Sequence, residues 1–361
     1  MAESLLIERV TKRYSADALA LDAVTIEAAA GTFLVLLGPS GSGKTTLLRS
    51  VAGIERISDG RITIGDRVVA DGRTHVLPER RRLAMVFQDY ALWPHLSALE
   101  NVSFALRRHL PSASRRREQA REMLDRVGLG HMTHRYPSEL SGGEQQRVAL
   151  ARALVGGAGL VLCDEPLSNL DADLRERMRV EVASLVRESG VTTVYITHDQ
   201  AEAFALADRI GVLERGRLIQ LDRPEEIYAH PATPFVARFT GLAAELEVTL
   251  RVPAGAGQPV EVELGGSRVA AEAMEPLEPG RALLAVRPAA ASLCAPDAPG
   301  CHARGTVADV AFRGRGYEVA VDLASGERVS GVVTPVRVGR SEAAGLRFGP
   351  GGCLVFGLLP S

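Results

Sequence analysis

Residues 38–45 read Gly-Pro-Ser-Gly-Ser-Gly-Lys-Thr, which fits the phosphate-binding pattern G-x-x-x-x-G-K-[ST]. The segment follows a strand-like apolar run and precedes a helical pattern, which is the context that this motif requires. Glycines let backbone N–H groups approach phosphate oxygens, and a helix that starts near Lys44 points its positive end at the anion. Lys44 would neutralise the β- and γ-phosphates, and the Thr45 hydroxyl would bind Mg²⁺. The candidate phosphate-contacting residues are Gly38, Ser40, Gly41, Ser42, Gly43, Lys44, Thr45 and Thr46.

Two acidic residues follow a second buried-strand pattern at 160–163. Asp164 ends that strand beside the expected phosphate loop, where a carboxylate can hold Mg²⁺ directly or through water. Glu165 should point to the opposite side of the pleat, which suits a residue that polarises the attacking water. The alternative is a pair of solvated acids at a strand end, and the neighbouring phosphate loop argues against it.

A second phosphate-binding element is predicted at residues 140–147, Leu-Ser-Gly-Gly-Glu-Gln-Gln-Arg. Ser141 fits a helix N-cap, and Glu144 three residues later completes a capping box. Gly142 and Gly143 then expose backbone N–H groups at the helix start, where anions bind. A helix start with flexible glycines is the simpler alternative.

The remaining pattern indicates the elements that must position these residues. Strand-like runs alternate with helical patterns through the first two-thirds of the chain, which predicts an α/β domain with a largely parallel core sheet. Residues 60–69 suggest an added hairpin, and a mostly helical stretch at about 89–140 predicts an insert. The core strand-like runs lie at 32–37, 83–87, 160–163 and 192–197.

The texture of the sequence changes near residue 241. Short β-rich runs separated by glycine and proline follow. They predict a small all-β domain that forms a barrel. We therefore expect a nucleotide-binding domain over residues 1–240 and a β-rich domain over residues 241–361.

Composition narrows the class further. The chain has 361 residues, enough for two domains. Its net charge of −2 argues against sequence-independent nucleic-acid binding, which needs a basic surface. No apolar run approaches the ~20 residues of a membrane helix, and the N-terminus has no signal-peptide pattern. The four cysteines, Cys163, Cys294, Cys301 and Cys353, form no C-x-x-C pair, which fits a reducing cytoplasm.

The segment at 141–147 resembles the signature sequence of ATP-binding-cassette (ABC) ATPases. Gln88 resembles the Q-loop residue of that family, Asp171 ends a segment similar to its D-loop, and His198 resembles its switch histidine. Tyr14 stands where the family has an aromatic residue that stacks on adenine. The resemblance implies a P-loop NTPase fold of the ABC type with a helical insert, and ATP and Mg²⁺ as cofactors.

The same resemblance implies roles for these residues. Gln88 would contact Mg²⁺ or water, and His198 would contact the γ-phosphate and orient the water together with Glu165. In the family, the signature segment of one subunit closes on ATP held by the phosphate loop of another. This chain has one copy of each, so a head-to-tail dimer with two composite sites is implied.

Residues 85–95 resemble the importer branch that includes the maltose, polyamine, sulfate and ferric-iron ATPases. This implies ATP hydrolysis that powers a transmembrane permease fed by an external solute-binding protein, with the chain peripheral on the inner face of the membrane. An exposed apolar group of Tyr90, Leu92 and Trp93 is the predicted permease dock; core packing is the alternative. The β-rich tail resembles the branch's regulatory domain, which is TOBE- or OB-like.

The sequence does not identify the transported solute, because an ATPase subunit does not need to contact the solute. The residues at 310–317 favour ferric iron or a polyamine, with a sugar, sulfate or another anion as alternatives. A non-transport ABC ATPase acting on DNA or ribosomes is the alternative from another class. It predicts a coiled-coil insertion, a second cassette or a basic surface, and none is visible in the sequence.

Three smaller expectations concern local structure. The basic run at 80–82 should be solvated surface. Asp199 and Glu202 fit a second capping box, which would fix His198 at a helix start. Asn169, where relatives frequently have a small residue, should matter little.

Overall fold

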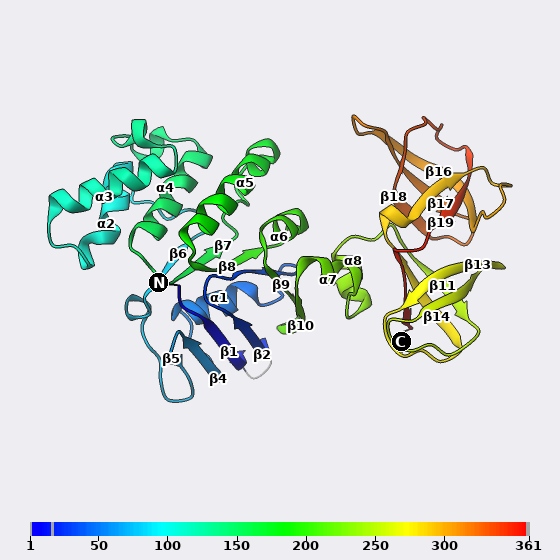
Figure 1. Cartoon of the computed structure of the whole chain (residues 1–361), viewed down its shortest axis with the longest axis horizontal. Coiled ribbons are helices and arrows are strands. Elements are labelled where there is room, and N and C mark those ends of the chain that lie inside the picture. The colour runs from blue at the N-terminus through cyan, green and yellow to red at the C-terminus, as the bar shows by residue number, and fades with distance from the viewer. Residues whose placement is uncertain (1, 16–17, 359–361) are drawn as a thin grey trace. The chain divides into compact units, whose positions relative to one another are not determined.

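The computed structural model describes residues 2–15 and 18–358, except the side chain of residue 172, and divides the chain into two compact units (Figure 1). Unit 1 is Met1–Pro224 and unit 2 is Glu225–Ser361. The division falls before the expected one at 240/241, because two short helices, α7 (Pro224–Ala229) and α8 (Pro234–Phe239), precede the β-rich part. Ala237 of α8 is fully buried in an apolar cluster with residues of the β-rich part, so this helix belongs to unit 2.

The main sheet of unit 1 has six strands in the order β10-β9-β3-β8-β7-β6. All neighbours pair in parallel except β9 and β10, so the predicted α/β fold with a largely parallel core sheet is confirmed. The strands are β3 (Phe33–Leu37), β6 (Leu83–Val86), β7 (Leu160–Asp164), β8 (Thr192–Thr197), β9 (Arg209–Glu214) and β10 (Arg217–Asp222).

Three central strands end at the same edge of this sheet. Every residue of β3, β7 and β8 is buried, as the near-continuous apolar runs predict for a parallel sheet covered on both faces. The register pairs Leu37 with Thr197, and Asp164 with Ile196. The loops after these strands therefore start side by side.

A second, antiparallel sheet of unit 1 has the order β2-β1-β4-β5. Its strands are β1 (Leu5–Arg13), β2 (Leu19–Ala28), β4 (Asp59–Ile64) and β5 (Arg67–Ala70). The sequence predicts only the β4–β5 hairpin. One apolar core joins both sheets to helix α1 (Lys44–Ala52), which buries Leu47, Leu48 and Val51.

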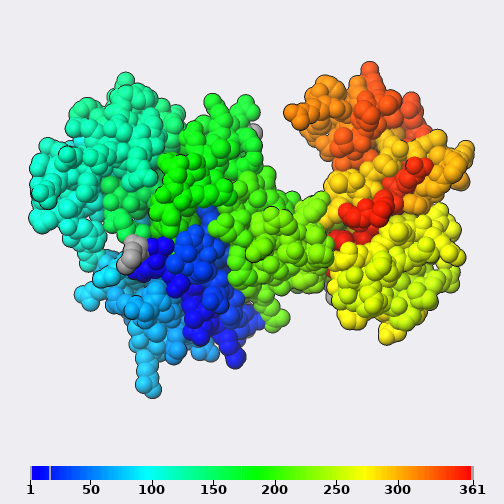
Figure 2. Space-filling view, in the orientation of Figure 1, coloured from blue at the N-terminus to red at the C-terminus, as the bar shows by residue number. Residues whose placement is uncertain are grey.

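The helical insert forms its own small core. Helices α2 (Ala98–Ala105), α3 (Ala113–Arg126) and α4 (Gly142–Val155) bury one apolar cluster, which includes Val102, Leu124 and Val148. In the space-filling view, residues of α2 and α3 form a distinct lobe of unit 1 (Figure 2). Two further helices, α5 (Ala172–Ser189) and α6 (Gln200–Leu206), complete the unit.

Unit 2 contains a closed barrel and a second sheet, so the predicted barrel is confirmed. The barrel has the order β11-β12-β13-β20-β14, and the five-stranded sheet has the order β15-β19-β16-β17-β18. One apolar core runs through both. The strands are β11 (Ala244–Leu250), β12 (Pro259–Leu264), β13 (Ser267–Ala273), β14 (Gly280–Val286), β15 (Ala291–Cys294), β16 (Ala303–Phe312), β17 (Tyr317–Leu323), β18 (Arg328–Thr334), β19 (Ala343–Phe348) and β20 (Cys353–Gly357).

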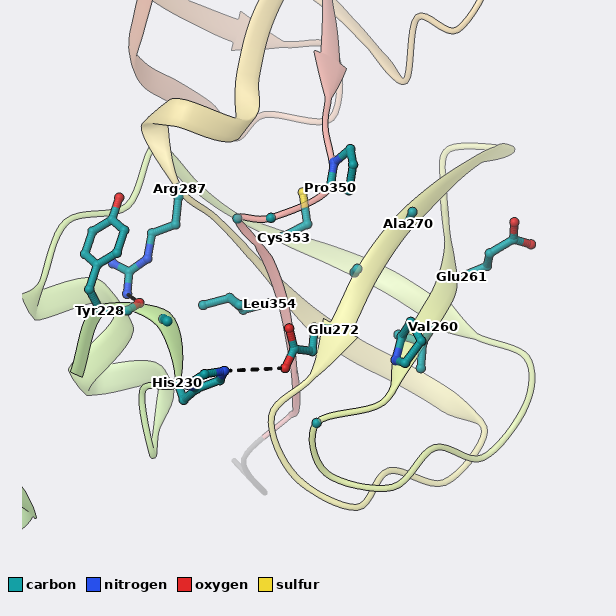
Figure 3. A pocket seen from close by; sticks show the side chains of 16 residues that line it. Tyr228, His230, Val260, Glu261, Ala270, Glu272, Arg287, Pro350, Cys353 and Leu354 are labelled. Atoms are coloured by element: carbon teal, nitrogen blue, oxygen red, sulfur yellow. Dashed lines mark hydrogen bonds and ion pairs between the residues drawn. The ribbon is translucent and has the colours of Figure 1, made fainter. Parts of the chain in front are cut away.

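One buried arginine fastens the two short helices to the barrel. Arg287, only 2% exposed, donates from Nη2 to the carbonyl of Tyr228 at 2.6 Å and from Nη1 to that of Ala237 at 3.0 Å. Nη1 also donates to the Thr240 hydroxyl at 3.1 Å and the Gly241 carbonyl at 2.8 Å. The guanidinium lies over the Tyr228 ring, 4.1 Å from its centroid (Figure 3). These contacts offset the cost of burying a charge.

Truncation of this side chain should therefore destabilise unit 2. We expect Arg287→Ala to lower the free energy of unfolding of unit 2 by about 3 kcal/mol, because several buried carbonyls lose a charged donor. Urea unfolding followed by circular dichroism measures this. The matched control is Arg281→Ala, since Arg281 forms only an exposed ion pair with Glu247 and its loss should leave stability unchanged. Equal effects of both substitutions would contradict the role of Arg287.

Candidate nucleotide-binding site

The predicted phosphate loop connects β3 to α1. Its glycines are required by space and conformation. Gly43 has φ +100°, and a Cβ there would lie 2.6 Å from the carbonyl oxygen of Ala20. A Cβ on Gly38 would lie 2.4 Å from the carbonyl oxygen of Leu213. Ser40 and Gly41 are exposed at the tip of the loop, whereas Ser42 is buried beneath it.

Lys44 lies inside the curl of this loop and is 4% exposed. Its Nζ donates to the carbonyls of Gly38 at 2.7 Å and Pro39 at 2.9 Å, and to the Ser42 hydroxyl at 3.3 Å. Burial lowers the pKa of Lys44, and the nearby carboxylates of Glu165 and Asp164 oppose this shift. The loop thus holds the Lys44 ammonium group near the carboxylates of Glu165 and Asp164.

Asp164 lies across from the start of α1. Its Oδ1 accepts a hydrogen bond from the Thr45 hydroxyl at 3.5 Å, so two predicted Mg²⁺ ligands from distant parts of the sequence lie together. Burial raises the pKa of the Asp164 carboxyl, and Arg49 partly offsets the shift. Thr46, the next residue of the helix, accepts the Ser50 hydroxyl at its carbonyl.

Glu165 and His198 form the second polar pair of this edge. The Glu165 Oε2 lies 2.9 Å from the His198 Nδ1, although the residues are 33 positions apart in the chain. Glu165 has φ +43°, an uncommon conformation for a residue with a side chain. Its main-chain N–H donates to the Ile196 carbonyl at 3.2 Å, and this bond to β8 supports the conformation.

His198 directly precedes a helix start, but the predicted capping box there is wrong. Asp199 caps α6 by accepting the N–H of Glu202 at 3.1 Å. The Glu202 carboxylate does not return to the cap. It accepts the hydroxyl of buried Tyr195 at 2.9 Å instead. A buried phenol on β8 competes for this carboxylate, and the local spacing of residues does not reveal it.

The capping box at the signature segment is confirmed. Ser141 Oγ accepts the N–H of Glu144 at 3.4 Å, and Glu144 Oε2 accepts the N–H of Ser141 at 2.7 Å. Gly142 and Gly143 form the first turn of α4. A Cβ on Gly143 would lie 3.2 Å from Leu174 of α5, so this glycine also permits close packing.

Three predicted site residues lie in exposed segments around this centre. Gln88 is exposed, and its carbonyl accepts the Asn169 side-chain amide at 2.9 Å. Asn169 therefore connects the segment of Gln88 to the segment that ends at Asp171, a role that the sequence does not reveal. Asp171 caps α5 by accepting the N–H of Leu174 at 2.9 Å. Tyr14 is 57% exposed, with Lys12 Nζ 4.7 Å from its ring centroid.

The sequence does not reveal the buried contacts of two arginines near the site. Arg81, assigned to solvated surface, is 2% exposed and donates to the carbonyls of Ser50 and Val51 at the end of α1. Arg152 of α4 donates to the carbonyls of Tyr90 at 2.7 Å and Ala91 at 2.6 Å. It thus connects the signature helix to the segment after Gln88. Both arginines bind main-chain oxygens, which carry no sequence signal.

The predicted exposed group of Tyr90, Leu92 and Trp93 is wrong in part. Tyr90 is 5% exposed, and no partner for its buried hydroxyl is found among the described residues. Leu92 is half-buried against the core of the insert. Trp93 is 45% exposed and lies against Phe104, with ring centroids 5.7 Å apart. The exposed apolar surface is therefore Leu92, Trp93 and Phe104, which we call the Trp93 patch.

The fold and the site together define a P-loop ATPase, and comparisons with known proteins identify its kind. The ABC transporter family model matches residues 21–168, and the TOBE domain model matches residues 284–356. The spermidine/putrescine import ATP-binding protein PotA 2 of Pseudomonas aeruginosa is 41% identical over 94% of this chain and 93% of its own. The Fe(3+) ions import ATP-binding protein FbpC of Brucella abortus is 43% identical over 90% and 89%.

A solved structure of an ATP-binding cassette is also similar to this chain. The dimeric, post-hydrolysis state of the ATP-binding cassette MJ0796 bound to ADP and Pi has a TM-score of 0.54 and 33% identity, and covers 61% of this chain and 98% of its own. The chain belongs to the ABC transporter family, as an ATP-binding subunit of an importer that hydrolyses ATP to drive transport. None of the helices within residues 2–15 and 18–358 is long and apolar enough to cross a membrane.

Proposed function

We propose that the edge formed by β3, β7 and β8 binds MgATP and cleaves its γ-phosphate. The observation that carries this proposal is the contact between Glu165 and His198, 2.9 Å apart at the strand edge that holds Lys44 and Asp164. Glu165 polarises the attacking water, and His198 orients that water and contacts the γ-phosphate. Lys44 and the loop amides neutralise charge on the phosphates, so catalysis is positioning with electrostatic stabilisation.

The donor set at Asp164 fits Mg²⁺. This ion prefers one or two carboxylates together with substrate phosphates and water, and no three described His, Cys, Asp or Glu residues form a complete metal cage. The Thr45 hydroxyl and the Asp164 carboxylate would hold the ion, with Gln88 contributing directly or through water. When bound, Mg²⁺ would neutralise charge on the β- and γ-phosphates. Tyr14, which is 57% exposed, would stack on adenine.

Removal of the carboxylate at residue 165 tests the assignment. We expect Glu165→Gln to lower kcat for ATP hydrolysis by about 10²–10⁴-fold, because the general base is lost. ATP affinity should stay within about threefold of the wild type, since Lys44 and the loop are intact. Phosphate release and equilibrium binding of a fluorescent ATP analogue measure the two quantities. Near-normal turnover in this variant would exclude Glu165 from the role.

We infer that two copies of the chain complete each other's site. Each chain has one phosphate loop and one signature segment, and the similar cassette MJ0796 is a dimer in its post-hydrolysis state. In a head-to-tail dimer, Gly142 and Gly143 of one copy would present their N–H groups, and Ser141 its hydroxyl, to the ATP held by the other. Asp171 would lie near the same interface, because it binds the N–H of Leu174, which packs against Gly143.

The Trp93 patch supports a permease-docking surface. Fully buried Asn101 holds the turn beneath it: the Asn101 side chain accepts the N–H of Trp93 at 2.9 Å and donates to the carbonyls of Trp93 and Leu96. An exposed aromatic residue on a rigid support is typical of an interface anchor. The permease would hold the chain at the inner face of the membrane, with an external binding protein acting through the permease.

The docking role has a direct test. Trp93→Ala should weaken co-purification with the permease by about tenfold, because the interface loses a large side chain that the complex would bury. Basal ATPase activity should be unchanged, since Trp93 lies outside the nucleotide edge. Tyr136→Ala is the matched control, because Tyr136 is an exposed aromatic residue of unit 1 with a similar exposed fraction, 46%. Equal recovery of the permease with both variants would contradict the role.

For the solute, we propose a cation, Fe³⁺ or a polyamine. Two relatives that align over at least 90% of this chain are named for the import of spermidine/putrescine and of Fe(3+) ions. The same co-purification, with the Glu165→Gln chain and MgATP, recovers the external binding protein, and mass spectrometry identifies its ligand. A sugar or an inorganic anion in that protein would overturn the solute assignment and leave the ATPase assignment intact.

We propose a regulatory role for unit 2. A cavity of about 510 Å³ opens beside the barrel, between the end of α7 and strands β12, β13 and β20 (Figure 3). His230 and Glu272 both line this cavity, and His230 Nε2 lies 3.9 Å from Glu272 Oε1. A cavity of this size suits a small-molecule effector.

Removal of unit 2 tests this role. A chain that ends at Pro224 removes the unit whole, whereas a cut near residue 241 would leave α7 and α8 without Arg287. We expect the shortened chain to retain ATP hydrolysis and permease binding but to lose inhibition by solute accumulated inside the cell. Transport assays in vesicles preloaded with solute measure this. Inhibition equal to that of the full chain would exclude regulation through unit 2.

A further inference from the structure

Two of the four cysteines lie together in unit 2. Cys294 is the last residue of β15, and Cys301 follows a short loop, just before β16. Strand β19 runs between β15 and β16, and its residue Gly345 pairs with both Cys294 and Arg304. Gly345 of β19 therefore lies between the two segments of chain that carry the cysteines.

Gly345 provides the room for this approach. A Cβ at this position would lie 2.7 Å from the Cys301 Sγ and 2.9 Å from the Cys294 Sγ. Both distances are shorter than real Cβ contacts, so the two sulfur atoms occupy the space that any other residue would fill. Two sulfur atoms at the same small niche are close enough to react with each other after a modest rotation of their side chains.

The loop that carries Cys301 is fixed by groups other than the sulfur atoms. Arg347 Nη2 donates to the Pro299 carbonyl at 2.7 Å, and Arg304 Nε donates to the Pro296 carbonyl at 2.8 Å. The Cys301 N–H donates to the Ala298 carbonyl at 3.1 Å. Side chains of β19 and β16 thus hold the loop, and neither cysteine is in a disulfide.

The thiols form a short hydrogen-bonded chain. Cys294 hydrogen-bonds to Cys301, and the Cys301 thiol donates to the Ala303 carbonyl at 3.2 Å. Burial, followed by the contact with Cys301, raises the pKa of the Cys294 thiol, whereas Arg347 lowers it.

The other two cysteines provide a contrast within the same chain. Cys163 is buried in β7 and Cys353 in β20, and burial raises their thiol pKa values to about 12 and about 11. Both are inert small apolar residues by this criterion. Cys294 and Cys301 are each only partly buried.

We propose that Cys294 and Cys301 are a reactive dithiol that hydroperoxides convert to an intramolecular disulfide. The Cys301 thiolate attacks the O–O bond of the peroxide and becomes a sulfenic acid, and hydroxide leaves. The Cys294 sulfur then attacks the sulfenic sulfur, and the S–S bond forms as water leaves. Two thiols lose two electrons and two protons, and hydrogen peroxide is reduced to two molecules of water. This site is independent of ATP hydrolysis and of the proposed docking and cavity.

Peptide mass spectrometry of the full chain tests the proposal. No lysine or arginine lies between the two cysteines, so both are in one tryptic peptide that ends at Arg304. After hydrogen peroxide treatment and alkylation with N-ethylmaleimide, we expect this peptide to lack both alkyl groups and to be lighter by two hydrogen atoms. Reduction by dithiothreitol should restore alkylation at both positions.

Three variants separate the disulfide from general oxidation. Cys353→Ser should form the product to the wild-type extent, because it leaves the dithiol intact. Cys294→Ser should form none, and its Cys301 should instead label with dimedone, which traps sulfenic acid. Gly345→Ala should reduce the yield of the disulfide, because its Cβ separates the sulfur atoms; circular dichroism checks that this variant folds.

Two outcomes would overturn the proposal. One is full alkylation of both cysteines in wild type after peroxide treatment. The other is disulfide-linked pairs of chains in place of the closed peptide.

Discussion

The in-register parallel pairing of β3, β8 and β7 is the constraint on which the nucleotide site depends. Leu37, Asp164 and Thr197 are the last residues of these strands, and the register brings their ends to one edge. A one-residue slip in a strand would reverse which face each side chain points to. The phosphate loop, the two carboxylates and His198 come from three separate parts of the chain, and this register brings them together.

Helix α4 connects this edge to the insert. Its N-terminus is the signature segment, and its last turn carries Arg152, which binds the carbonyls of Tyr90 and Ala91. Asn169 binds the carbonyl of Gln88 from the other side. Two polar side chains thus hold the segment from Gln88 to Ala91, which precedes Trp93 closely in the sequence.

The elements that rest on local chemistry could be predicted from the sequence. The glycine loop, the Ser141–Glu144 capping box and the mainly apolar core strands β3 and β7 each have a local sequence pattern. Contacts between distant residues could not be predicted. The sequence predicts that Arg81 is a surface residue, but in the structure it binds a main-chain carbonyl at the end of α1. The sequence predicts that Glu202 completes a capping box, but its carboxylate binds the Tyr195 hydroxyl instead. The contacts of Arg287 with α7 and α8 could not be predicted for the same reason, since three of its acceptors are main-chain oxygens.

The central claim is that each ATP site is built from two chains, and a mixing experiment tests it most directly. Glu165→Gln removes the carboxylate that we propose to be catalytic, and Ser141→Arg blocks the signature segment; each variant alone should be nearly inactive. A mixed dimer contains one site made from the intact phosphate-loop side of the Ser141→Arg chain and the intact signature of the Glu165→Gln chain. The account predicts that mixing restores hydrolysis to roughly a quarter of the wild-type rate, for random pairing of independent sites. Mixed dimers that form but stay inactive would contradict it.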